Sequence, residues 1–145
     1  MTRLYADTSA LARAYLPEEP DHPTLRSLLL DGPDVVVTSE ITRVELTSAL
    51  AAADRAGRLT DLATLLARVE ADCGVAGRIL LLALRPDVAL PRARLLVLEH
   101  PLTTLDALHL AVALDEAVDG DEELVFVTRD ERQGAAAEAF GLEVR

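Results

Sequence analysis

The chain has 145 residues, half of them hydrophobic, which predicts a single domain, residues 1–145, with a substantial buried core. Its formal net charge of −11 argues against broad electrostatic binding of nucleic acid, so any nucleic-acid contact must be local. All 14 basic residues are arginine and Cys73 is the only cysteine, which excludes lysine-dependent phosphate loops, Schiff-base catalysis and a cysteine-based zinc site.

The first predicted element is a strand over residues 3–6, followed by favoured N-cap residues at 7–9 and a helix over 10–16. This segment has one early arginine and an apolar stretch broken by charges, unlike a signal peptide or a membrane span. We therefore expect a soluble, cytoplasmic protein with no membrane partner. A second helix is predicted over residues 24–30, beyond three prolines.

A short β-branched run predicts a buried strand over residues 34–37. Thr38 or Ser39 should then cap a long helix that ends at Ala56, before a glycine. An amphipathic helix is expected over residues 61–73.

The second half of the chain continues the alternation of strands and helices. Residues 78–82 could form a third strand, although a leucine-rich run also suits a helix. A helix is predicted from near Pro91 to Leu98, with the proline tolerated in its first turn. Thr103 or Thr104 should cap the next helix. The remaining elements are a helix at 105–118, a strand at 124–128, a helix at 131–140 and an edge strand at 142–144.

Short apolar strands alternating with helices predict an α/β fold with a parallel sheet covered on both faces. Open parallel sheets place their ligands beyond the carboxyl ends of the strands. Asp7 and Asp130 each lie just past such an end. Aspartate between a strand and a helix is also a preferred N-cap, which explains each of them about as well as function does.

Glu45 is harder to explain as a surface residue. Ile41 lies one helical turn before it and Ala49 one turn after it, so the carboxylate falls within an apolar stripe. An unpartnered carboxylate there would cost several kcal/mol, so a cation or an arginine must compensate it. The alternative to a functional role is an internal salt bridge with Arg13 or Arg43.

Asp106 lies in the first turn of the most hydrophobic predicted helix. A helix N-terminus favours an anion, but a helix apolar on nearly every face belongs in the interior, where a carboxylate suggests the floor of a charged pocket. His109, three residues later, shares roughly the same helical face. A satisfied structural histidine explains it better than a direct role does.

Acidic groups packed together repel one another unless a cation binds between them. Oxygen ligands without cysteine favour Mg²⁺ or Mn²⁺, which suits hydrolysis of phosphodiesters by a metal-activated water. Thr8, Ser9 and Thr128 carry hydroxyls that could hold the phosphate or a metal-bound water, although capping explains each about as well.

Four segments resemble PIN-domain ribonucleases, in particular the VapC toxins of type II toxin–antitoxin systems. The resemblance covers essentially the whole chain, with the segments in the expected order and spacing. They are Asp-Thr-Ser-Ala-Leu at 7–11, Thr-Ser at 38–39 leading to Val-Glu-Leu at 44–46, Leu-Asp-Ala-Leu-His-Leu-Ala at 105–111, and Val-Thr-Arg-Asp at 127–130.

The resemblance implies a PIN-like α/β/α sandwich around a central parallel sheet of four to five strands. It implies Mg²⁺- or Mn²⁺-dependent endonucleolytic cleavage of RNA (tRNA, rRNA or mRNA) that leaves a 5′-phosphate and a 3′-hydroxyl. By motif, Asp7 and Asp106 match the direct metal ligands, while Glu45 and Asp130 complete the metal and water shell, directly or through water. A homodimer and a cognate VapB-like antitoxin that blocks the site are also implied.

One departure concerns how RNA would be held. Many relatives carry an arginine a few residues before the third acidic position, where this chain has Pro-Leu-Thr-Thr at 101–104. If that arginine holds RNA in relatives, Arg43, Arg94 or Arg129 must substitute here, or the substrate contact differs.

Four alternatives to a toxin ribonuclease differ in chemistry or partner. A haloacid dehalogenase-like hydrolase needs a second aspartate where Ser9 stands, and a receiver-like signalling domain needs a lysine that the chain lacks. A PIN-like RNA-processing nuclease outside a toxin–antitoxin system would share the chemistry. A non-catalytic PIN-like binding module would have lost acidic positions, and all four are present.

Overall fold

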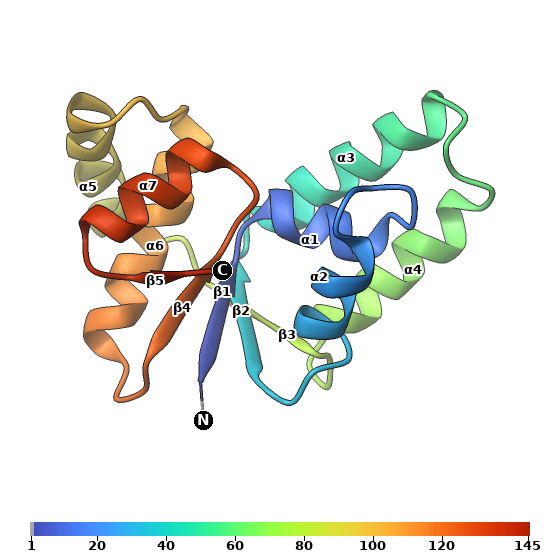
Figure 1. Cartoon of the computed structure of the whole chain (residues 1–145), viewed down its shortest axis with the longest axis horizontal. Helices are drawn as coiled ribbons and strands as arrows, with labels where there is room; N and C mark the ends of the chain where they lie inside the picture. The colour runs from blue at the N-terminus through green and yellow to red at the C-terminus, as the bar shows by residue number, and fades with distance from the viewer. Residues whose placement is uncertain (1) are drawn as a thin grey trace.

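The computed structural model describes residues 2–145 and contains a five-stranded parallel sheet in the order β3-β2-β1-β4-β5 (Figure 1). Both the sheet and its parallel pairing confirm the fold predicted from the sequence. The strands are β1 (Arg3–Ala6), β2 (Val35–Ser39), β3 (Ile79–Leu82), β4 (Leu124–Val127) and β5 (Glu143–Val144). The helices are α1 (Thr8–Tyr15), α2 (His22–Leu29), α3 (Thr42–Arg55), α4 (Leu62–Asp72), α5 (Pro86–Glu99), α6 (Thr104–Asp119) and α7 (Glu131–Ala139).

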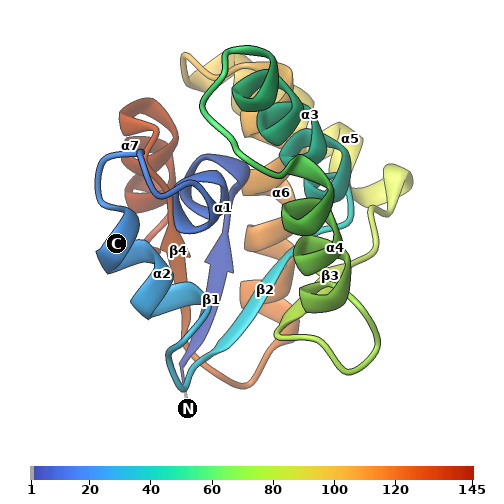
Figure 2. The ribbon, with the colours of Figure 1, turned by 90° about the vertical axis from the view of Figure 1, so that its right-hand side faces the viewer.

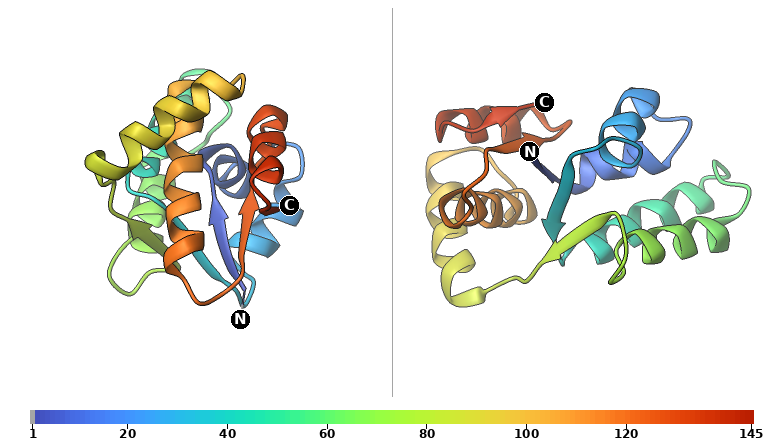
Figure 3. Two further views of the ribbon diagram at one scale, coloured as in Figure 1. Left: turned by 90° about the vertical axis from the view of Figure 1, so that its left-hand side faces the viewer. Right: turned by 90° about the horizontal axis from the view of Figure 1, so that it is seen from below.

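Helices cover both faces of the sheet, α1 to α4 on one side and α5 to α7 on the other (Figures 1 and 3). Successive side chains of a strand point to opposite faces, so Leu4 packs with α1 to α4 and Tyr5 with α5 to α7. Both residues are fully buried, as expected for a central strand of a parallel sheet. β1 therefore contributes to two hydrophobic cores.

The central strand β1 and its two neighbours, β2 and β4, are each followed by a helix. β1 pairs with β2 on one side and with β4 on the other, all three running in the same direction. Their carboxyl ends lie at one edge of the sheet, from which α1, α3 and α7 begin (Figure 2). Side chains at these three junctions are thus brought to the same edge.

The predicted cap of α3 is wrong. β2 continues through Thr38 and Ser39, and α3 begins only at Thr42, with no side-chain hydrogen bond at its N-cap. The Thr38 hydroxyl instead donates to the Ala6 carbonyl at 2.6 Å, a contact between adjacent strand ends. A hydroxyl that sequence assigns to a helix cap is used here to join two strands.

The predicted start of α5 is also wrong. Pro86 occupies the first turn, where a missing N–H is harmless, and Pro91 therefore lies inside the helix. For residues 78–82 the sequence allowed either a strand or a helix, and the structure has the strand β3 there. In the described part of the chain no single helix is long and apolar enough to cross a membrane, although α5 and α6, bent by 119°, reach that length and composition as a pair.

Candidate active site

Asp7 stands at the junction of β1 and α1 and is almost fully buried, with 3% of its surface exposed. Its Oδ1 accepts hydrogen bonds from the Ala10 amide at 3.1 Å and the Ser9 hydroxyl at 2.8 Å, so it is the N-cap of α1. Capping does not require burial, because Asp61 caps α4 in the same way while fully exposed. Burial raises the pKa of Asp7 in spite of its hydrogen bonds.

Glu45 lies in the first turn of α3, and its side chain is 20% exposed. Its Oε1 accepts from Thr8 Oγ1 at 3.0 Å and from His109 Nε2 at 2.5 Å. Partial burial acts to raise the pKa of Glu45, but the hydrogen bond and charge interaction with His109 and the hydrogen bond from Thr8 outweigh it and hold the pKa below its usual value. Glu45 is therefore ionised at neutral pH.

The arginine partners proposed for Glu45 from the sequence are wrong. Arg43 forms an ion pair with Glu70 of α4, and Arg13 forms no ion pair within residues 2–145. The partner is His109, which the sequence placed on the face of Asp106 and not beside α3.

His109 is 2% exposed and hydrogen-bonded at both ring nitrogens, so its reading as a satisfied histidine is confirmed. Nδ1 lies 2.9 Å from the hydroxyl of Tyr5, and Nε2 faces Glu45. Burial raises the pKa of Tyr5 well above its usual value, so the phenol keeps its proton. Tyr5 is a member of this cluster that sequence reasoning missed, since a tyrosine in a buried strand looks like core.

A second polar cluster joins β4, α7 and α6. Asp130 is the N-cap of α7, accepting from the Gln133 amide at 2.8 Å. The buried side chain of Gln133 accepts from the Thr128 hydroxyl at 2.8 Å and donates to the Asp106 carbonyl at 3.2 Å. Gln133 was also missed, and its only sequence signal is a polar residue one turn into an alanine-rich helix. It ties the start of α6 to the end of β4.

Asp106 lies in the first turn of α6 and is half-buried. Thr103 caps this helix by accepting from the Asp106 amide at 3.2 Å, as predicted. The Asp106 carboxylate makes no hydrogen bond or ion pair with any residue from 2 to 145. Thr103 and Gln133 hydrogen-bond the backbone of Asp106, while its carboxylate is free to bind a ligand.

The three hydroxyls singled out from the sequence already use their protons within the protein. Thr8 donates to Glu45 and Ser9 to Asp7, while Thr128 donates to Gln133. Ser9 also accepts from the Arg129 amide at 3.0 Å, which links α1 to the end of β4. These hydroxyls hold the framework of the edge together.

Asp7, Asp106 and Asp130 have no basic side chain within ion-pair distance among the described residues, so their charges are not neutralised by arginine. As the side chains stand, no three acidic, histidine or cysteine groups in residues 2–145 lie close enough to hold one ion. Mg²⁺ commonly takes only one or two carboxylates directly and keeps several waters. The carboxylates at this edge are oxygen donors, which a hard divalent cation prefers, and as the side chains lie at most two of the described groups could bind one ion.

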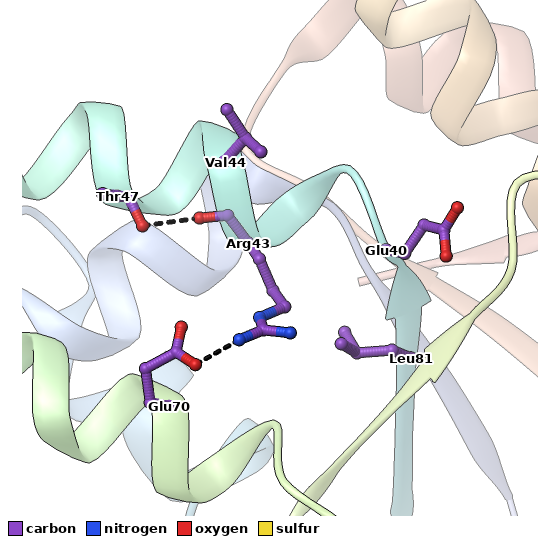
Figure 4. Close-up of a pocket in the computed structure, with 6 residues that line it drawn as sticks. All are labelled: Glu40, Arg43, Val44, Thr47, Glu70 and Leu81. Carbon is purple, nitrogen blue, oxygen red and sulfur yellow. Dashed lines mark hydrogen bonds and ion pairs between the residues drawn. The ribbon is translucent and has the colours of Figure 1, made fainter.

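Two pockets flank this edge of the sheet. One, of about 600 Å³, lies between α3, α4 and β3, and in it Arg43 reaches across to Glu70 (Figure 4). The other, of about 560 Å³, has Arg13 and Arg129 in its wall beside Thr128 and Asp130. Arg129 is held by Asp21 at 3.1 Å, whereas Arg94 is exposed on α5. Of the three arginines considered for RNA contact, Arg129 lies nearest in sequence to a site carboxylate.

Comparison with known proteins identifies the fold family. The model of the PIN domain matches residues 4–139. The structure is similar to the crystal structure of Mycobacterium tuberculosis VapC20, a sarcin–ricin loop cleaving toxin, with a TM-score of 0.64. The two chains are 21% identical, and the match covers 92% of this chain and 94% of that one. No curated protein sequence matches. The resemblance inferred from the four sequence segments is confirmed.

Proposed function

The chain belongs to the PIN-domain family, and from that premise we propose that it is a Mg²⁺- or Mn²⁺-dependent endoribonuclease acting as the toxin of a toxin–antitoxin pair. One observation carries the proposal. Asp7 is a nearly buried carboxylate at the carboxyl edge of a parallel sheet, with no basic partner within residues 2–145. Capping accounts for its hydrogen bonds but not for its burial, and a bound cation would compensate the buried charge.

Asp7 and Asp106 are the proposed direct ligands, with Glu45 and Asp130 completing the shell directly or through water. A divalent ion bound there would supply positive charge to a phosphoryl oxygen and lower the pKa of a water. Glu45 is ionised and has one oxygen tied down, so its other oxygen is available to orient the attacking water. Asp130 and Asp106 are held in place by the same buried glutamine.

The substrate class follows from the charge distribution and from the family. A protein with a net charge of −11 gains little from general electrostatic attraction to RNA, so it should bind the RNA phosphates through a few local contacts. Arg13 and Arg129 line the same pocket as Asp130. We propose that this pocket receives a phosphate next to the scissile bond, with Arg129 in the role of the arginine absent from residues 101–104.

The toxin role is proposed from the likeness to VapC20. The homodimer and the VapB-like antitoxin are proposed from the resemblance of the four sequence segments to VapC toxins. A PIN nuclease that processes RNA outside a toxin–antitoxin system is the second candidate, because it would use the same carboxylates. A short antitoxin-like reading frame immediately beside the gene supports the first candidate, and its absence supports the second.

The direct test is cleavage of bulk tRNA and rRNA by the purified protein with Mg²⁺ or Mn²⁺, with and without EDTA. Asp7→Asn should lose at least about a hundredfold in rate, as expected when a charge-stabilising group is removed from an active site. Asp61→Asn is the matched control, because it changes an aspartate cap of another helix and should leave cleavage unchanged. Cleavage that survives both EDTA and Asp7→Asn would contradict the metal–carboxylate mechanism. A folded wild-type protein that cleaves no RNA would favour the binding module.

A further inference from the structure

A chain of hydrogen bonds runs from Tyr5 through His109 to Glu45. Tyr5 lies in the middle of β1, His109 in α6 and Glu45 in α3, so three separate elements meet here. The distances are 2.9 Å from Tyr5 Oη to His109 Nδ1 and 2.5 Å from His109 Nε2 to Glu45 Oε1. The two aromatic rings meet edge to face, with their centroids 6.1 Å apart. Core packing alone needs neither polar group.

The chemistry of the three groups limits how they can bond. A carboxylate only accepts, so His109 presents Nε2–H to Glu45. Nδ1 then accepts from the Tyr5 phenol in a neutral ring or donates to it in a protonated one, and the hydroxyl fixes the ring in either case. The tyrosine thus orients the ring, and the ring orients the carboxylate.

Both hydrogen bonds to Glu45 fall on the same oxygen. Thr8 Oγ1 lies 3.0 Å and His109 Nε2 2.5 Å from Oε1, and the two donors are 3.3 Å from each other. Oε2 accepts no hydrogen bond from any residue in 2–145, and the side chain remains partly exposed. One oxygen is held by the protein and the other is left for solvent or a ligand.

We propose that Tyr5 and His109 are positioning residues, which together with Thr8 fix the rotamer of Glu45 so that Oε2 faces the active site. This role rests on the proposed ribonuclease function and deepens it, because it assigns a task to two buried residues that are not among the four carboxylates. It also explains why a tyrosine and a histidine occupy a core otherwise built from aliphatic side chains and Phe126.

The kinetic test compares two buried tyrosines. Tyr5→Phe removes only the hydroxyl that orients His109. Tyr15→Phe is the matched control. It removes a tyrosine hydroxyl that donates to Asp72 at 2.7 Å, and Asp72 is not one of the four proposed site carboxylates. Tyr5→Phe should lower kcat for RNA cleavage by roughly three- to tenfold, the value of one hydrogen bond, with KM within about twofold. Tyr15→Phe should change neither. Equal effects of the two substitutions on kcat would overturn the proposal.

Two substitutions of His109 test its role, one that removes the N–H donor and one that keeps it. His109→Leu removes the donor to Glu45 and should lower kcat by roughly ten- to a hundredfold, the value of a hydrogen bond to a charged group. His109→Gln keeps a side-chain N–H that can reach the carboxylate and should recover most of that loss. His22→Gln, which changes a histidine bonded to the Arg13 carbonyl, is the matched control and should behave as wild type. No difference between the Gln and Leu variants at position 109 would contradict the positioning role.

A readout independent of cleavage is the ¹³C NMR signal of the Glu45 carboxyl, assigned through Glu45→Gln. It should shift in Tyr5→Phe and in His109→Gln and stay in place in Tyr15→Phe and His22→Gln. An unmoved signal in both Tyr5→Phe and His109→Gln would overturn the proposal even if activity falls. If the wild-type protein cleaves no RNA, the ribonuclease function fails, and this signal still decides whether Tyr5 and His109 hold Glu45.

Discussion

At the scale of single residues, the four carboxylates predicted from the sequence differ in what holds them. Asp7 and Asp130 are helix caps, as their positions allowed, and Glu45 is bound to a histidine. Asp106 alone makes no side-chain hydrogen bond or ion pair within residues 2–145. A capping aspartate can also bind a metal through its second oxygen, so the cap and the proposed site are compatible at Asp7.

Burial of Asp7 has a consequence for stability. A carboxylate whose pKa is raised on folding opposes folding once it ionises, so stability is lost as pH rises through the folded-state pKa. In metal-free buffer, Asp7→Asn should therefore raise the melting temperature at pH 7, and the gain should vanish at pH values acidic enough to protonate Asp7. Asparagine can still accept the capping hydrogen bonds. Thermal melts of both proteins across pH check this, and a melting temperature lowered at pH 7 would contradict it.

A test of Asp130 must separate its role as the N-cap of α7 from its proposed role in the metal and water shell. Asp130→Asn should keep the cap and the free energy of unfolding, whereas Asp130→Ala should destabilise by about 1 kcal/mol. If Asp130 contributes to the metal and water shell, both variants should lose at least about tenfold in cleavage rate, in line with the loss of an outer-shell metal partner. Urea unfolding and cleavage assays on the same preparations decide. Full activity in Asp130→Asn would leave Asp130 as a cap only.

At the scale of elements, sequence reasoning located all five strands because short apolar runs bounded by turns identify buried parallel strands. It misplaced the starts of α3 and α5, where Thr38 joins strands and Pro91 sits inside a helix. It placed the four carboxylates on the correct elements. It could not find the contacts of His109 with Tyr5 and Glu45, because these residues are 104 and 64 positions apart in sequence and meet only through the fold.

The internal proline of α5 gives an element-scale prediction. Pro91 lacks the N–H that would bond within the helix, and a proline in a helix interior costs about 3 kcal/mol relative to alanine. Pro91→Ala should therefore raise the free energy of unfolding by about 1 to 3 kcal/mol. Pro86→Ala, at the start of the same helix, is the control and should have little effect. Urea denaturation measures both, and a destabilising Pro91→Ala would show that the proline is needed for packing.

At the scale of the whole molecule, the net charge of −11 sets the expected response to salt. If only one or two arginines contact phosphates, RNA affinity should fall by less than about tenfold between roughly 50 and 200 mM salt. A protein that used a broad basic surface would lose several orders of magnitude over the same range. Measuring the KM for RNA against salt concentration tests this. A steep dependence would mean that a basic surface outside the two arginine-lined pockets binds RNA.

The proposed metal site requires Asp7, at the junction of β1 and α1, and Asp106 of α6 to bind one divalent cation at the carboxyl edge of the sheet. Titration of the metal-free protein with Mn²⁺, followed by electron paramagnetic resonance, tests it without reference to any RNA. Binding should be present in wild type and in Asp61→Asn, and it should be lost in Asp7→Asn and in Asp106→Asn. Equal Mn²⁺ binding by all four proteins would contradict the account.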